Sequence, residues 1–281
     1  MIEVIFLLVL AAVWLAFAAI LDLKTTIIPN WISFSLVILA LGFRFFYSLF
    51  GSDGFGFFYQ GLIGFGIFFI LENLFYYGRI FAGGDAKLMM ALGAVLPFSD
   101  SFRVNAEIFL SFIVIFLLAS SLYVLAASGY FAARNGKKFR AEFAKRYKAS
   151  RKWSVPLMLL GIILMALGFM NEIFFFAGIL VFISPLLYIY SKSVDEACMI
   201  KKASPEKLLE GDWLYHDVRV NGKTIKSSWD GLSAGDIRLL RKAKKKVWIR
   251  QGVASSPVFL ISLLVLVYAY FINTGLWNSF W

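Results

Sequence analysis

The sequence predicts an all-α polytopic membrane protein with about eight transmembrane helices and a small cytoplasmic α/β insert before the last helix. Hydrophobic residues make up 60% of the 281 residues and charged residues only 16%. The mean hydropathy is +0.78, which is typical of a chain that lies largely in a bilayer. Most hydrophobic blocks are about 20 residues long, the length that a bilayer requires.

Eight hydrophobic blocks follow one another along the chain: 2–21, 31–50, 55–77, 80–98, 106–131, 153–170, 173–190 and 253–271. The first has neither a basic region nor a small-residue cleavage site, so we expect a retained helix rather than a removed signal peptide. The fourth is the weakest. Its uncharged part is too short to cross, so it spans only if Asp85 and Lys87 lie in its first turns.

The distribution of Lys and Arg favours eight crossings. With all eight blocks crossing and the N-terminus outside, 26 of the 28 basic residues lie on one side. If the fourth block did not cross, the nine basic residues of 134–152 would lie outside, against the positive-inside rule. We therefore predict that both termini are outside and that Asp22 and Asp85 lie at the cytoplasmic face of the plasma membrane. Arg44, near the outer end of the second block, is expected to extend to the headgroups.

These crossings divide the chain into five predicted parts. They are a transmembrane core with both aspartates (1–131), a basic cytoplasmic loop (132–152), a helix hairpin (153–191), a cytoplasmic insert (192–252) and a C-terminal transmembrane helix (253–281). Within the insert, Asn221-Gly222 predicts a hairpin turn. Ser233 followed by Asp236 predicts a capped helix start.

The composition also limits which partners and cofactors we expect for this protein. The net charge is +11, but cytoplasmic loops of membrane proteins collect Lys and Arg, so the charge does not indicate nucleic acid as a partner. The bilayer itself is the expected partner of the hydrophobic blocks. One Cys and one His argue against a structural zinc site, and we expect no metal and no cofactor.

Two aspartates are the candidate functional residues. Asp22 closes the first hydrophobic block, and Asp85 follows Gly83 and Gly84. An ionisable residue at the edge of a bilayer is expensive and is a functional-site hypothesis by default. Two carboxyls that meet can perform general acid–base chemistry on water. Because helix dipoles favour negative charge at the start of a helix, we expect Asp85 to be the base and Asp22 the acid.

The residues around the aspartates have candidate supporting roles. The two glycines permit close approach of a substrate or another backbone, and Pro29 can open the second helix. The full supporting set is Gly83, Gly84, Lys87, Lys24, Pro29 and Asn30. A lone aspartate at a helix end is more often a cap, and paired glycines are more often a packing contact. Two such aspartates on one side of the membrane, each with Lys two residues later, favour function.

Two other classes of function are compatible with charged residues in a membrane protein. A transporter or channel uses aspartates as ion or proton sites, but it usually shows internal repeats and charges near the bilayer midplane. A non-enzymatic membrane scaffold leaves two matched aspartate motifs unexplained. We therefore rank the ion-coupled transporter as the alternative to an enzyme.

The motifs resemble those of the type IV prepilin peptidases. Asp22-x-Lys24 with the segment 28–30 is similar to their first aspartate motif, and Gly84-Asp85-x-Lys87 is similar to their second, the GxGD motif. The missing zinc-binding cysteine domain and the insert at 192–252 resemble the archaeal branch, which includes preflagellin peptidases. The chain departs from the family at Ala82, where the pattern has Gly. Presenilin-like proteases share GxGD but carry a different first motif.

The resemblance implies a membrane aspartic endopeptidase with Asp22 and Asp85 as catalytic residues and no cofactor. Its partners would be precursors with class III, type IV pilin-like signal peptides. The enzyme would cut their short basic leader at the cytoplasmic face, just before the hydrophobic segment.

Overall fold

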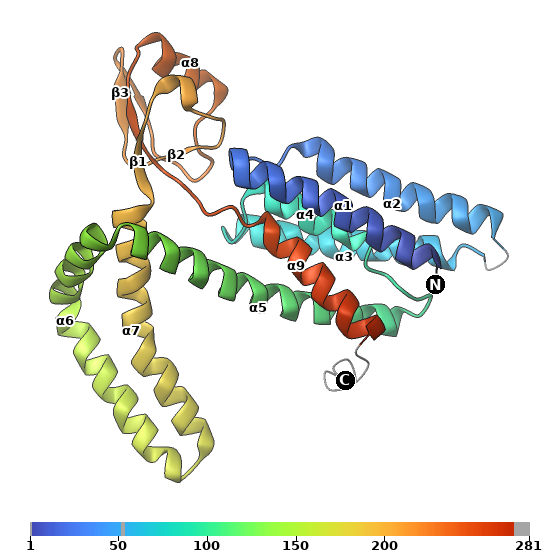
Figure 1. Ribbon diagram of the computed structural model, residues 1–281, viewed down its shortest axis with the longest axis horizontal. Coiled ribbons are helices and arrows are strands. Elements are labelled where there is room, and N and C mark those ends of the chain that lie inside the picture. The colour runs from blue at the N-terminus through green and yellow to red at the C-terminus, as the bar shows by residue number, and fades with distance from the viewer. Residues whose placement is uncertain (1, 52–53, 273–281) are drawn as a thin grey trace. The chain divides into compact units, whose positions relative to one another are not determined.

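The computed structural model describes residues 2–51 and 54–272, and Figure 1 shows its helices and strands. The chain forms two compact units, one from residues 1–124 together with 253–281 and the other from 125–252. The part of the predicted C-terminal segment at 273–281 lies outside the described residues. Both candidate aspartates belong to the first unit.

The described part of the first unit consists of helices joined by short loops, with no strand. Its elements are α1 (Ile2–Thr25), α2 (Asn30–Phe50), α3 (Gly56–Tyr77), α4 (Gly83–Gly93), the first part of α5 (Phe102–Arg134), α9 (Ser256–Val267) and the π-helical turn η3 (Tyr268–Ile272). α9 packs against α1 although the two helices come from opposite ends of the chain (Figure 1). A single apolar core joins the helices, with Leu15, Leu92 and Phe259 fully buried within it.

The structure confirms an all-α membrane protein, because six described helices are long and apolar enough to cross a bilayer. The predicted count of eight crossings is not confirmed. The helix of the fourth block, α4, has only 11 residues, and the last apolar helix, Ser256–Ile272, is also shorter than the other candidate spans.

The segment 83–100, which begins with α4, nevertheless reaches from one end of α1 to the other. At one end of α1, Asp22 lies close enough to Asp85 of α4 for their charges to interact. At its other end, Glu3 lines a cavity together with Asp100. The segment 83–100 therefore extends over a helix of 24 residues, about 36 Å at 1.5 Å per residue. It covers this length as 11 residues of helix followed by non-helical chain.

Arg44 satisfies the backbone that this break leaves free. Its side chain is fully buried in α2. Its guanidinium donates to the carbonyl oxygens of Ala94, Val95 and Pro97, at 2.9, 3.0 and 2.6 Å. A fourth bond, of 3.0 Å, goes to the carbonyl oxygen of Phe57, whose ring lies 4.1 Å from the guanidinium carbon. The prediction that Arg44 extends to the headgroups was wrong, because these carbonyls, invisible as a pattern in sequence, hold it inside.

Two glycines bring α3 and α4 into direct backbone contact. A Cβ atom at Gly64 would lie 2.3 Å from the carbonyl oxygen of Gly93, and one at Gly93 would lie 2.5 Å from that of Gly64. Such distances exclude any side chain at either position unless the helices separate. The contact sets the depth at which α4 packs, and therefore the position of Asp85 at its start.

The second unit begins with a helical hairpin. α6 (Gly136–Ala166) and α7 (Glu172–Cys198) pack side by side, joined by the short 3-10 helix η1 (Leu167–Phe169). A Cβ atom at Gly178 would lie 2.5 Å from the backbone nitrogen of Met165, so this pair also packs through its backbone. The basic residues of 134–152 lie on helix, most of them in the first half of α6.

The sheet region confirms the small insert before the last helix. Its elements are β1 (Ile200–Ala203), η2 (Pro205–Lys207), β2 (Trp213–Leu214), β3 (Val218–Val220), β4 (Lys223–Ile225), α8 (Ala234–Lys242) and β5 (Val247–Arg250). β5 pairs antiparallel with β1 on one side and with β2 on the other. The predicted hairpin is β3–β4, with Asn221 and Gly222 at φ values of 47° and 80°. Ser233 and Asp236 form the predicted capping box.

Candidate active site

Asp22 is buried in the last turn of α1, with 6% of its surface exposed. Its carboxylate oxygen Oδ2 accepts two hydrogen bonds from Ser256, one from the backbone N–H at 3.1 Å and one from the hydroxyl at 2.8 Å. Ser256 is the first residue of α9. The end of the first helix is therefore tied to the beginning of the last one, and a carboxylate lies at the joint.

Asp85 is buried in the first turn of α4, with 8% of its surface exposed. The side chain of Ser255 is a hydrogen-bonding neighbour of this carboxyl. Its oxygen Oδ1, however, has no hydrogen-bond partner among the described residues. Burying a carboxyl oxygen without a partner is costly, so this oxygen is available to a molecule that enters the site.

The structure brings the two sequence motifs together at one end of the first unit. Asp22 and Asp85 are near enough to act on one another electrostatically, with Ser255 and Ser256 of the α9 start beside them. Phe81, next to the Asp85 motif, packs on Phe116 and Phe259 with ring centroids 5.7 and 6.1 Å apart. Two carboxyls with apolar rings nearby form a site in which charge interactions are strengthened by the exclusion of water.

The supporting residues divide into those that touch this arrangement and those that do not. A Cβ atom at Gly84 would lie 3.0 Å from Ile28, so the glycine allows the two motifs to pack together. Lys87 donates to the side-chain oxygen of Asn30 at 2.7 Å and so links α4 to α2. Lys24 is exposed, and a Cβ atom at Gly83 would make only an ordinary contact with Tyr76, at 3.7 Å.

The backbone around α4 and α2 also shows what Ala82 and Pro29 do. Ala82 precedes α4 with φ −72° and ψ 158°, an extended conformation open to any residue, so Ala in place of the family's Gly creates no backbone strain here. Pro29 lies immediately before α2 with φ −63°, the value to which its ring restricts it.

Sequence reasoning missed Ser255 and Ser256 at the start of α9. Ser256 lies 234 residues from Asp22 in the chain, and serine is common in every class of segment. A local signal was nevertheless present, because Ser followed by Pro257 at the start of an apolar run is typical of a helix N-terminus. The sequence did not show that the hydrogen-bond partner of this helix N-terminus is Asp22.

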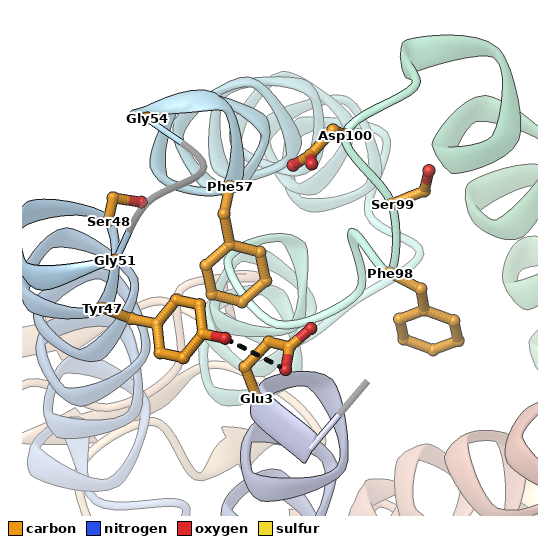
Figure 2. Close-up of a pocket in the computed structure, with 9 residues that line it drawn as sticks. All are labelled: Glu3, Tyr47, Ser48, Gly51, Gly54, Phe57, Phe98, Ser99 and Asp100. Atoms are coloured by element: carbon orange, nitrogen blue, oxygen red, sulfur yellow. Dashed lines mark hydrogen bonds between the residues drawn. The ribbon is translucent and has the colours of Figure 1, made fainter.

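A cavity of about 200 Å³ opens at the opposite end of the unit. Figure 2 shows its lining residues, among them Glu3, Phe57 and Asp100, and the hydrogen bond of 3.4 Å from the Tyr47 hydroxyl to Glu3. Glu3 lies in the first turn of α1 whereas Asp22 lies in the last. The cavity is thus separate from the paired aspartates and does not belong to the candidate active site.

The fold and the paired carboxyls define the class, a multi-pass helical membrane protein with an acidic site at one end of its helices. Residues 9–128 match the sequence model of the type IV leader peptidase family. The matched segment holds both aspartates, so this part of the chain resembles the peptidase family that the motifs indicated. Comparisons with curated proteins and with solved structures found no match.

Proposed function

We propose that the protein is an aspartic endopeptidase that removes the short basic leader from type IV pilin-like precursors, including prearchaellins, at the cytoplasmic face. One observation carries the proposal: Asp22 and Asp85, from motifs about sixty residues apart, are both buried and lie within electrostatic reach of one another at one end of the first unit. Two adjacent carboxyls can share one proton and activate water, as in aspartic proteases.

In this proposal hydrolysis needs only the two carboxyls and a water molecule. One carboxylate takes a proton from water, and the resulting hydroxyl adds to the scissile carbonyl carbon. The other carboxyl gives its proton to the carbonyl oxygen. The tetrahedral gem-diol then collapses. One of its hydroxyls returns a proton to the carboxyl that acted as the acid, the carbon–nitrogen bond breaks, and the leaving amine takes the proton that the first carboxylate removed.

The contacts favour a division of roles opposite to the one expected from helix dipoles alone. Oδ2 of Asp22 accepts two hydrogen bonds from the N-terminus of α9, and donors of this kind stabilise a negative carboxylate. Oδ1 of Asp85 is buried without a donor, an environment that suits a protonated carboxyl. We therefore assign Asp22 as the base and Asp85 as the acid. Site-resolved titration in which Asp85 loses its proton first would reverse the assignment.

The orientation in the membrane is part of the same proposal. The placement of 26 of the 28 basic residues on one side supports eight crossings and a cytoplasmic active site. The segments 83–100 and 256–272 would be the two crossings that are not regular long helices, since each runs the length of α1. A leader still in the cytoplasm, attached to a hydrophobic segment already in the bilayer, would then meet the aspartates.

The test is a cleavage assay in membranes with prepilin and prearchaellin substrates that carry a Lys/Arg-Gly leader junction. We expect the wild type to remove the leader, and Asp22→Asn and Asp85→Asn at matched expression to leave it uncut. Asp100→Asn, at the opposite end of the unit, is the control and should cleave normally. Cleavage by either active-site variant would remove that residue from the mechanism. A wild type that cuts no such precursor would put the ion-site alternative ahead.

A further inference from the structure

The first turn of α9 makes a contact with Asp22 that the type IV leader peptidase match does not include, because this match ends at residue 128. Ser256 is fully buried and gives both of its donors, the N–H and the hydroxyl, to the same carboxylate oxygen. Two hydrogen bonds to one oxygen restrict rotation of the carboxyl plane. Asp22 is therefore held in one orientation by the last helix.

The local sequence leaves Ser256 few other partners. Pro257 has no N–H, and the N–H of Val258 donates to the Ser255 carbonyl oxygen at 3.0 Å. The hydroxyl of Ser256 also lies 3.5 Å from the carbonyl oxygen of Ala18, but the Asp22 oxygen is much closer, at 2.8 Å. Because a hydroxyl has a single proton, the shorter contact takes it.

Another buried serine of α9 shows the contrast. Ser262 is also fully buried, but its hydroxyl donates to the carbonyl oxygen of Val258 in its own helix, at 2.7 Å. Such a bond is local, and it holds no group of the site. Ser256 differs because its hydroxyl leaves its own helix and reaches a functional carboxylate.

We propose that Ser256 is a positioning residue for the peptidase reaction, and that it acts by fixing the orientation of the Asp22 carboxylate through its hydroxyl. This inference rests on the proposed function, since it assigns Asp22 to the hydrolysis of the leader. The first turn of α9 then completes an active site whose two aspartates come from α1 and α4.

The test compares Ser256→Ala, Ser256→Thr and Ser262→Ala in steady-state cleavage of a prepilin substrate. Loss of a hydrogen bond to a charged group predicts a fall in kcat of about tenfold to a hundredfold for Ser256→Ala, with KM nearly unchanged. Ser256→Thr keeps a hydroxyl and should restore most of kcat, and Ser262→Ala should behave as the wild type. Wild-type kcat in Ser256→Ala, no rescue by Thr, or an equal loss in Ser262→Ala would overturn the proposal.

A second measurement keeps this inference separate from the proposed function. The thermal unfolding midpoint is compared for Ser256→Ala in the wild-type and in the Asp22→Ala background. We expect Ser256→Ala to lower the midpoint only where Asp22 is present, because its partner is otherwise absent. If the wild type cleaves no precursor, the proposed function fails, and this cycle alone decides whether Ser256 acts through Asp22. If the two substitutions lower the unfolding midpoint additively, Ser256 does not act through Asp22, and the proposal fails.

Discussion

At the Glu3 end of the first unit, the buried guanidinium of Arg44 donates to four backbone carbonyl oxygens, of which three follow α4. At the other end, the buried carboxyl of Asp85 leaves one oxygen without a partner. Both groups are ionisable side chains buried inside one helical bundle, and of the two only Arg44 has a hydrogen-bond partner for each of its polar side-chain atoms. A buried polar group with its hydrogen bonds made is compatible with a stable fold, whereas one left without a partner lowers stability and is retained where chemistry needs it.

The largest expected effect comes from removing the unsatisfied carboxyl. Asp85→Asn should lower the rate of leader cleavage by about 10²- to 10⁴-fold, the contribution typical of a general acid or base. Its thermal unfolding midpoint should not fall, because the substitution removes no hydrogen bond to Oδ1. Cleavage rate and midpoint are measured on one preparation in detergent. A midpoint that drops together with the rate would make Asp85 a structural residue.

The second-largest effect is expected at Arg44, where the substitution should lower stability. Arg44→Met keeps the volume but leaves four carbonyl oxygens without a donor, so we expect a loss of about 3–5 kcal/mol in the free energy of unfolding. Arg103→Met is the control, since the Arg103 side chain is 89% exposed and its ion pair within the described part of the chain is with Glu107 of its own helix. Reversible unfolding in mixed micelles measures both. Equal stability of the two variants would contradict the role assigned to Arg44.

A smaller effect is expected where α3 and α4 touch. Gly64→Ala places a methyl group 2.3 Å from the Gly93 carbonyl oxygen, and the resulting shift of α4 should cost about 1–3 kcal/mol. Gly66→Ala is the matched change two residues later, where a Cβ atom meets nothing within 4 Å. Since α4 holds Asp85, cleavage should fall in Gly64→Ala and stay normal in Gly66→Ala. An active Gly64→Ala protein would show that Asp85 tolerates movement of its helix.

The smallest effect concerns the link between Lys87 and Asn30. Their bond of 2.7 Å is near the surface, so a double-mutant cycle of Lys87→Ala and Asn30→Ala should give a coupling free energy of about 0.5–1 kcal/mol. The coupling should weaken as salt is added, because one partner is charged. A coupling of several kcal/mol would place this pair in the site rather than beside it.

Features whose cause lies within a few residues could be read from the sequence. The hairpin turn at Asn221-Gly222 needs two residues with positive φ, and the helix start at Ser233 needs a side chain to accept its first N–H groups. The six long helices follow from apolar length in the same way. The two aspartate motifs could be found because their residues lie together in the chain.

Contacts between distant segments could not be read in this way. Arg44 and Ser256 are hydrogen-bonded to partners 50 and 234 residues away. Nothing in the sequence around Arg44 or Ser256 indicates which residues these partners are. The break after α4 had one local signal, Pro97, but hydropathy did not show it, because residues 94–96 are as apolar as the helix before them. Hydropathy records that a segment is buried, but not whether its backbone bonds are made within it.

The contact between Ser256 and Asp22 has a consequence for the order in which the protein is made. Translation produces α1 first and α9 last, so both aspartates reach the membrane well before the serine that holds one of them. A nascent chain that ends anywhere before residue 256 carries an incomplete site. If Ser256 orients Asp22 as proposed, leader cleavage can reach its full rate only after the first turn of α9 has been made and has packed against α1.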